Sequence, residues 1–291
     1  MMLRLVTWNI QWGKGVDGRV DLGRIVDTAM RLADADVLCF QEVAVNFPSL
    51  DGGAGEDQPA RLAALLPQHR VVFRPAVDMY GPPSDNEHHG FGNAILSRLP
   101  VLQVFNHLLP RPAERGGHSM QRHALEVIVA APFGPLRIVT THLEYFSLAH
   151  RAAQVERLRL LHQEASQRAY RPDRLDESDG PYRVVPRPAS SVLCGDFNIE
   201  PTDPLHAALT APFDDDITPA WRDAWTAAHP PGTPHDPTCG IADREQWPGG
   251  PHCRDFVFVT EDLASRVAAV TVDTATTASD HQPVALTLAA S

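Results

Sequence analysis

Short apolar runs recur along almost the whole chain, and they constrain the possible fold more than any other feature. Runs of this length, bounded by polar and turn-forming residues, are typical of buried β-strands. Apolar residues at helical spacing predict helices only over 21–33 and 149–168, with a shorter helix over 204–209. The predicted strands are 3–7, 37–40, 71–73, 94–96, 124–129, 136–140, 191–194, 256–260 and 284–288.

The order of these segments indicates the fold class. Strands outnumber helices, and many strands are neighbours in sequence, so the chain is unlike a repeated β-α-β winding. The pattern favours an α/β (α+β) protein with mixed sheets and helices on the outside. We predict a single domain over residues 1–291, because the two long polar or Pro/Gly-rich segments, 170–190 and 229–252, interrupt no core pattern.

The apolar runs also bear on location. None approaches the roughly 20 residues needed to cross a bilayer, so no transmembrane segment is expected. The first residues, MMLRLVTWNI, are typical of a strand and not of a cleaved signal, which favours a cytoplasmic protein. Cys239 and Cys253 flank a Pro/Gly loop, and we expect two free thiols there rather than a disulfide.

Net charge limits the kind of partner. The chain carries a formal charge of -11. A protein that binds DNA through many phosphates usually presents a basic face. The overall charge therefore opposes tight binding of a long nucleic acid, although a local arginine patch is compatible with it.

Polar side chains stand at the ends of many predicted strands. Because strand ends can meet on one rim of a sheet, these groups can form one site, and unpaired charges deeper in a core would be unfavourable. The residues that follow strands are Asn9, Glu42, His142, Asp196 and Asn198, and those that precede strands are Asp255, Asp280 and His281.

The residue types of this set indicate a chemistry. Carboxylates and amides without clustered cysteines form a hard oxygen site, which favours Mg²⁺ or Mn²⁺ over zinc. Such an ion lowers the pKa of bound water and offsets charge on a phosphate oxygen. The sequence contains no H-x-x-x-H or H-E-x-x-H pair to support a zinc or iron centre built on its 14 histidines.

Six motifs carry a family resemblance. In chain order, TWNI, QE, GFGNAILSR, THLE, GDFN and SDHQP resemble the endonuclease/exonuclease/phosphatase superfamily, and they extend from residue 7 to residue 283. Each motif alone is weak, but together, each beside a predicted strand, they are specific. The resemblance implies a four-layered sandwich of two packed mixed β-sheets flanked by helices, with the site at one end of the sheets.

The resemblance also implies roles for the residues in these motifs. Glu42 would be the main ligand of Mg²⁺ or Mn²⁺, with Asn9 and Asp280 supporting metal binding. Asp196 would orient or deprotonate the attacking water, and Asn198 would hold the scissile phosphate.

Further residues would surround the substrate. His281 would contact the phosphate and be oriented by Asp255, while His142 would act from the other side. Asn93, in GFGN, would line the site, and Arg122 would neutralise substrate charge.

Two departures from related patterns concern the first motif and the residues around Asp255. The abasic-site endonucleases resemble N-x-x-G-L-R at the first motif, whereas Asn9 is followed here by IQWGKG, so that branch is disfavoured. Many relatives read R-x-D near the end of the chain, whereas Arg254 directly precedes Asp255 here.

The predicted function is therefore hydrolysis of a phosphate ester by in-line attack of water. Nucleic acid, nucleotide, sugar phosphate and phospholipid all remain open as substrates, because the motifs describe phosphate chemistry and not the leaving group. The alternative is a catalytically silent relative that binds a phosphorylated partner. The presence of Glu42, Asp196 and His281 disfavours that alternative.

Overall fold

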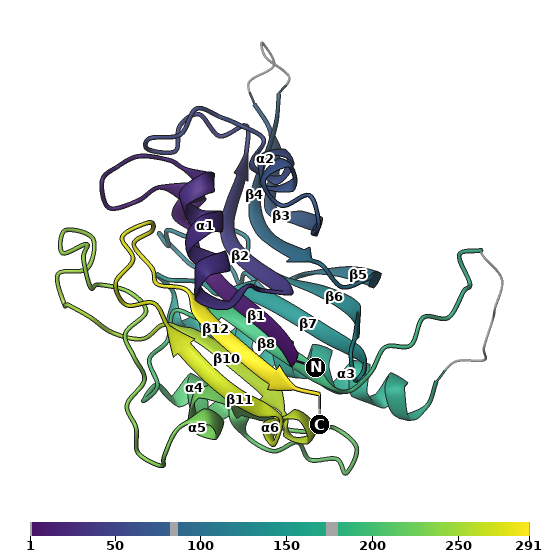
Figure 1. The fold of residues 1–291 in the computed structure, drawn as a ribbon. Helices are drawn as coiled ribbons and strands as arrows, with labels where there is room; N and C mark the ends of the chain where they lie inside the picture. Colours follow the sequence, from purple (N-terminus) through teal and green to yellow (C-terminus); the bar gives the residue numbers. More distant parts are fainter. Residues whose placement is uncertain (1, 82–86, 173–179, 291) are drawn as a thin grey trace.

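Two six-stranded sheets pack face to face, and helices cover their outer faces (Figure 1). This architecture comes from a computed structural model, which describes residues 2–81, 87–172 and 180–290. The order of layers is helix, sheet, sheet, helix. The four-layered sandwich predicted from the sequence is thus confirmed.

The first sheet has the strand order β11-β12-β1-β2-β4-β3. β1 pairs parallel with β2 and antiparallel with β12, so the sheet is mixed. Its strands are β1 (Met2–Asn9), β2 (Val37–Val45), β3 (Arg70–Tyr80), β4 (His88–Ser97), β11 (Val267–Val272) and β12 (Val284–Ala289).

The second sheet has the order β5-β6-β7-β8-β10-β9. It contains one parallel pair, β7 with β8, and its other pairs are antiparallel. Its strands are β5 (Val101–Leu108), β6 (His123–Ala131), β7 (Gly134–His142), β8 (Ser191–Asp196), β9 (Trp221–Asp223) and β10 (Asp255–Thr260).

Helices form the two outer layers. α1 (Leu22–Ala33) and α2 (Gln58–Leu65) pack on the first sheet, and α3 (Leu148–Tyr170) and α4 (Pro204–Thr210) pack on the second. Ser147 caps α3 by accepting a hydrogen bond from the backbone N–H of His150. The remaining helices are short: η1 (Gln11–Gly13), α5 (Ala224–Ala228) and α6 (Glu261–Ala264).

Strand alternation explains how one sheet serves two cores. Leu3 and Leu5 of β1 point into the core between the sheets, whereas Val6 and Trp8 belong to the core beneath α1. Successive strand residues face opposite sides, so a sheet covered on both faces needs apolar residues at nearly every position. This is why the strands appear in the sequence as continuous apolar runs.

Some elements were not predicted from the sequence. β5 lies at the edge of its sheet and is only half-buried, β9 is three residues long, and β11 is also an edge strand. Edge strands lack a fully buried face and hence a continuous apolar run. The helices α2, α5 and α6 were missed too, because their sequences show no clear apolar period.

The two long connecting segments differ in structure. α3 extends to Tyr170, so the first of them begins later than expected, and its residues 173–179 lie outside the described part. Segment 229–252, all of which is described, contains no helix or strand, but Cys239 forms isolated bridges with His252 and His281. All four cysteines are free and buried, which confirms the expectation of unpaired thiols at Cys239 and Cys253.

Across the described ranges, none of the helices combines the length and the apolar character that crossing a membrane would require.

Candidate active site

Strand direction brings the polar strand ends together. β1 and β2 run parallel, and β1 ends at Asn9. Glu42 lies within β2, at a bulge just beyond the residues that pair with β1, and not after the strand as the sequence suggested. β7 and β8 also run parallel, and they end at His142 and Asp196. β10 runs antiparallel to β8, so its first residue, Asp255, stands opposite Asp196. The carboxyl ends of parallel strands and the start of an antiparallel neighbour thus meet at one edge.

The last strand completes this edge. β12 runs antiparallel to β1, so the residues just before β12 come beside the end of β1. Asp280 and His281 lie there, and the Ser279 hydroxyl donates a hydrogen bond to the Asn9 carbonyl at 2.8 Å. The indole N–H of Trp8 donates to the His281 carbonyl at 2.9 Å and fixes this turn further.

Asp196 occupies the centre of the site. Its Oδ2 lies 3.1 Å from Asn9 Nδ2, 3.4 Å from His142 Nε2 and 3.7 Å from His281 Nε2. Its Oδ1 accepts a hydrogen bond from the Asn198 backbone N–H at 2.9 Å. Two histidines from different sheets therefore face the same carboxylate oxygen, and a small group between them would contact all three side chains.

Asp255 orients His281. The His281 Nδ1 lies 2.8 Å from Asp255 Oδ2, which leaves Nε2 directed toward Asp196. Burial of His281 by itself lowers its pKa, but the charges of Asp255, Asp280 and Asp196 outweigh it and raise the pKa well above the ordinary value. This histidine therefore carries a proton at neutral pH and has a positive charge to offer a substrate.

His142 has the opposite character. Burial and the nearby Arg122 guanidinium lower its pKa to about 3, so it is neutral at ordinary pH. Its Nδ1 lies 3.7 Å from Glu42 Oε1 and its Nε2 faces Asp196. The two histidines thus differ in charge although they face one carboxylate.

Glu42 and Asp280 form the acidic side of the site. Burial and the charge of Asp280 raise the pKa of Glu42 to about 7, because a nearby negative charge disfavours a second ionised carboxylate. A divalent cation would relieve this repulsion, and oxygen donors suit Mg²⁺ or Mn²⁺. The residues present therefore fit the ion that the sequence implied.

The Asn9 side chain orients the acidic groups. Its Nδ2 donates to Glu42 Oε1 and to Asp196 Oδ2, both at 3.1 Å. Its Oδ1 accepts a hydrogen bond from the Gln11 N–H at 3.1 Å. In this arrangement Asn9 holds the Glu42 and Asp196 carboxylates in place.

Segment 229–252 reaches into the site through Gln246 and Trp247, which the sequence analysis did not assign. Gln246 Nε2 donates to Asp280 Oδ2 at 2.8 Å, and the indole N–H of Trp247 lies 3.4 Å from the same oxygen. Gln11 donates to the Gln246 side chain at 3.1 Å. No motif marks these residues, because they are far from Asp280 in sequence and come close only when the loop folds back.

Arg122 and Asn93 lie beside Glu42 and His142. All four line a cavity of about 10 Å³. Arg122 is buried with its Nε 3.5 Å from Glu144 Oε2, and its Nη1 has no hydrogen-bond partner among the described residues. A buried guanidinium with a free N–H is suited to binding a phosphate oxygen. Glu144, which balances Arg122, was also not assigned from the sequence.

A row of aromatic rings leads from His281 to the surface, and we call it the aromatic row. It comprises His281, Trp247, Tyr145, Phe146 and His118, with ring centroids 5.6, 5.9, 5.0 and 4.8 Å apart in that order. Exposure rises outward, from 7% for Trp247 to 40% for Tyr145 and 61% for Phe146.

Arg254 stands beside the aromatic row, with its guanidinium 5.5 Å from the Tyr145 centroid and 5.4 Å from the Trp247 centroid. The arginine that the sequence places next to Asp255 is therefore directed toward the rim of the site. Arg254 therefore places a positive charge beside the aromatic row.

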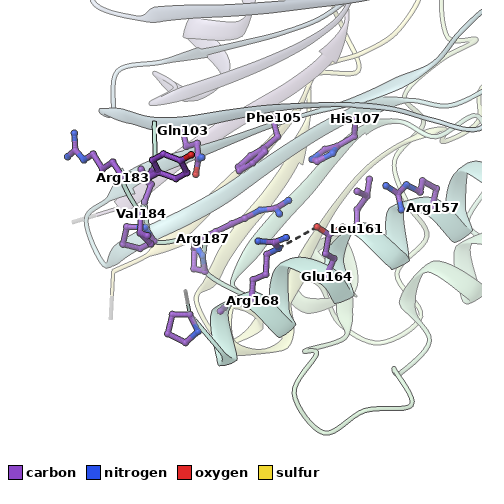
Figure 2. Close-up of a pocket in the computed structure, with 16 residues that line it drawn as sticks. Gln103, Phe105, His107, Arg157, Leu161, Glu164, Arg168, Arg183, Val184 and Arg187 are labelled. Carbon is purple, nitrogen blue, oxygen red and sulfur yellow. Dashed lines mark ion pairs between the residues drawn. The ribbon is translucent and has the colours of Figure 1, made fainter. Parts of the chain in front are cut away.

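A separate cavity lies away from these residues. It measures about 650 Å³ and lies between α3, β5 and the residues before β8 (Figure 2). Arg187 and Phe105 line it, but none of the predicted site residues does. Arg187 is already paired with the buried Glu126, with distances of 2.9 and 3.0 Å. This cavity is therefore not the catalytic centre.

Comparison with known proteins agrees with the fold. The model of the Endonuclease/Exonuclease/phosphatase family matches residues 6–281. A search of curated proteins found no match.

Solved structures of similar fold include an endonuclease/exonuclease/phosphatase from Beutenbergia cavernae, at 27% identity and TM-score 0.66, covering 99% of this chain and 71% of that one. The human Nocturnin catalytic domain is 18% identical with TM-score 0.61, covering 99% and 94%. Truncated Caenorhabditis elegans TDP2 is 15% identical with TM-score 0.62, covering 99% and 97%. Since the family match extends over nearly the whole sequence, this chain belongs to the endonuclease/exonuclease/phosphatase family.

Proposed function

We propose that this protein hydrolyses a phosphate ester by in-line attack of water, with the help of Mg²⁺ or Mn²⁺. Family membership supports phosphoester hydrolysis in general. The observation that carries the proposal is the position of Asp196 Oδ2, which two histidines of opposite charge character face beside the Glu42–Asp280 pair. We also propose a cytoplasmic location, since all four thiols are free, as in a reducing compartment.

Glu42 and Asp280 are the proposed ligands of the metal ion, and Asn9 supports them. When bound, the ion supplies a Lewis acid that offsets negative charge on the substrate. Gln246 and Trp247 donate to Asp280 Oδ2 and so orient this carboxylate. The network holds both acidic side chains before any ion or substrate arrives.

Asp196 is the proposed partner of the attacking water. Burial raises its pKa, but the nearby His142 and His281 outweigh burial and lower it below the ordinary value. The carboxylate is therefore ionised at neutral pH and accepts a hydrogen bond from water. A weakly basic carboxylate of this kind orients the nucleophile and accepts its proton as bonding to phosphorus advances.

Several cationic or hydrogen-bond-donating side chains would stabilise the negative charge of the phosphate. His281 is cationic, and Nη1 of Arg122, which has no hydrogen-bond partner in the described part of the chain, is a second donor. Asn198 has a left-handed backbone, and its Nδ2 donates to the Leu143 carbonyl at 2.9 Å, so its side chain is held at the floor of the site. Preorganised donors of this type usually make the largest contribution to catalysis.

The aromatic row favours a substrate with a planar group beside the scissile phosphate. Tyr145 and Phe146 present exposed rings next to the site, and base stacking on such rings contributes about 1–3 kcal/mol per base. The charge of -11 opposes the gripping of a long duplex. Together these features favour a nucleotide or a short single-stranded segment over a sugar phosphate or a phospholipid.

Hydrolysis assays test the function directly. Purified protein would be incubated with a single-stranded oligonucleotide, with plasmid DNA and with mononucleotides, in Mg²⁺, in Mn²⁺ and in EDTA. We expect metal-dependent cleavage that Asp196→Asn reduces by about 10²- to 10⁴-fold. Binding of phosphorylated compounds without turnover under any of these conditions would instead favour the catalytically silent alternative.

A further inference from the structure

A second cluster of metal-ligating side chains lies on the outer side of the second sheet. It consists of His206 on α4, Asp223 at the end of β9 and His235 in segment 229–252. Nε2 of His206 and Nε2 of His235 lie 2.9 and 2.8 Å from Asp223 Oδ2. One ligand atom from each residue lies within 4.8 Å of the others. We propose that these three residues bind a structural Zn²⁺ ion.

The two imidazole rings are held by aromatic neighbours. The His206 ring packs against Phe256 and Phe258, with centroids 5.1 and 5.4 Å away. The His235 ring stacks on Trp225 at 5.5 Å and 23°. These contacts direct both Nε2 atoms to one point in the folded protein, so little ordering is left for an ion to cause.

Asp223 is oriented as well. Its Oδ1 accepts a hydrogen bond from the Trp225 N–H at 2.9 Å and thereby caps α5. This leaves Oδ2 facing the two histidines. The Asp223 carboxylate is also almost completely buried, so an ion here would be largely shielded from competing water.

The donor set selects the metal. Two imidazole nitrogens and one carboxylate oxygen suit zinc, whereas Mg²⁺ prefers oxygen ligands alone. The same set with open positions also serves Fe²⁺ oxygenases. The adjoining cavity, lined by Asp223, His235 and Cys253, measures only about 10 Å³, enough for about one water molecule. It leaves space for one water molecule as a fourth ligand and none for a co-substrate and oxygen, so a structural role fits better.

A metal at this position would stabilise the loop that reaches the catalytic edge. His235 belongs to the same segment as Gln246 and Trp247, both of which donate to Asp280. Linking His235 to α4 and β9 would therefore limit the freedom of the loop on one side. The site uses none of the residues proposed for catalysis, so it stands or falls independently of the proposed function.

Zinc binding to the full chain tests this inference. Protein dialysed against EDTA would be titrated with Zn²⁺, and bound zinc and the melting temperature would be measured. We expect a rise in Tm of about 5 °C or more at a Zn²⁺ concentration about 100 times Kd. The rise and the bound ion should both disappear in His206→Gln and in His235→Asn.

Two further variants locate the ion. His229→Asn is the matched control, because His229 stacks on Trp225 with a centroid distance of 3.9 Å but contributes no atom to the cluster. It should keep the zinc response, and so should Glu42→Gln, which alters the catalytic carboxylates. If wild-type protein shows no zinc-dependent rise in Tm, or if Glu42→Gln abolishes it, the cluster is only a hydrogen-bonded network and the proposal is wrong.

Discussion

At the scale of single residues, the two histidines around Asp196 differ because their neighbours differ. His281 has Asp255 at 2.8 Å and two further carboxylates nearby, which raise its pKa. His142 is buried near Arg122, which lowers its pKa to about 3. The same side chain therefore supplies a cation on one side of the site and a neutral imidazole on the other.

Asp255→Asn tests the origin of the His281 charge. Without the Asp255 carboxylate the pKa of His281 falls, so this histidine loses its proton at lower pH. The alkaline limb of kcat/KM should shift to lower pH, and activity at neutral pH should fall by about 10²- to 10⁴-fold. The measurement is a pH–rate profile, with the exposed Asp214→Asn as control. An unshifted alkaline limb would contradict the assignment.

At the scale of secondary-structure elements, the parallel pair β7–β8 depends on a glycine in the GDFN motif. Gly195 has φ 135°, and a Cβ atom there would lie 1.9 Å from the Thr141 carbonyl oxygen. A side chain would separate the two strands whose ends carry His142 and Asp196. The glycine is thus required by close approach of two backbones.

Gly195→Ala should consequently destabilise the protein by about 3 kcal/mol or more, since the clash involves backbone that cannot move aside. Gly134→Ala is the matched control. Its φ is also positive, at 116°, but no described atom lies within 4 Å of the added Cβ. The free energy of unfolding of Gly134→Ala should fall by only about 1–2 kcal/mol. Urea unfolding of both variants measures the difference, and equal losses would show that the φ angle, not the contact, matters.

Glu126 on β6 forms an ion pair with Arg187, in the segment that precedes β8. Arg187 donates to both of its oxygens, at 2.9 and 3.0 Å, and His107 lies 3.2 Å away. Burial raises the pKa of Glu126, but the hydrogen bonds from His107 and Arg187 outweigh burial and lower it from 4.5 to about 2. The ionised form is therefore the one that the folded state stabilises.

This shift predicts a pH dependence of stability. A carboxyl whose folded pKa is lowered contributes stability above its unfolded pKa and loses it as the pH falls toward the folded value. At neutral pH the free energy of unfolding of the wild-type protein should exceed that of Glu126→Gln by about 3 kcal/mol. This difference should disappear as the pH falls from about 4.5 to about 2. Urea unfolding at a series of pH values measures it, and a constant gap would contradict the ion pair.

At the scale of the whole molecule, both sheets contribute to one core. Leu5 and Ile95 of the first sheet pack in the same cluster as Leu125 and Val192 of the second. A polar contact also crosses the interface, where Gln41 Nε2 donates to the Thr140 hydroxyl at 2.8 Å. A change in either sheet is therefore expected to affect the other, which is the basis for proposing a single domain.

Leu125→Ala tests this shared core. Leu125 is fully buried between the sheets, so its truncation should destabilise the protein by about 2–5 kcal/mol. Circular dichroism and tryptophan fluorescence should report one coincident transition, in the variant as in the wild type. Leu108→Ala, at an exposed position, should change little. Two separate transitions, with only one shifted, would show that the sheets unfold as independent units.

The central strands and the long helices follow from the amino-acid pattern alone. The apolar runs 3–7 and 191–194 fall within β1 and β8, and the periodic segment 149–168 falls within α3. This succeeds because burial on both faces of a strand, or on one stripe of a helix, is imposed position by position along the chain. The edge strand β5 was not predicted, since too few of its side chains are buried to produce a continuous apolar run.

Much of the candidate site was predictable as a set of residues, because most of its members lie at or near the ends of buried strands, although Glu42 lies within β2 and Asn93 within β4. How these residues meet depends on contacts between distant parts of the folded chain. Trp8 and His281 are 273 residues apart and form a hydrogen bond, and Gln246 reaches Asp280 from a loop without regular structure. The unequal charges of the two histidines and the His206–Asp223–His235 cluster also arise from neighbours that are distant in sequence. Hydrophobic pattern is local, whereas pKa and coordination depend on which distant groups folding brings within a few ångströms.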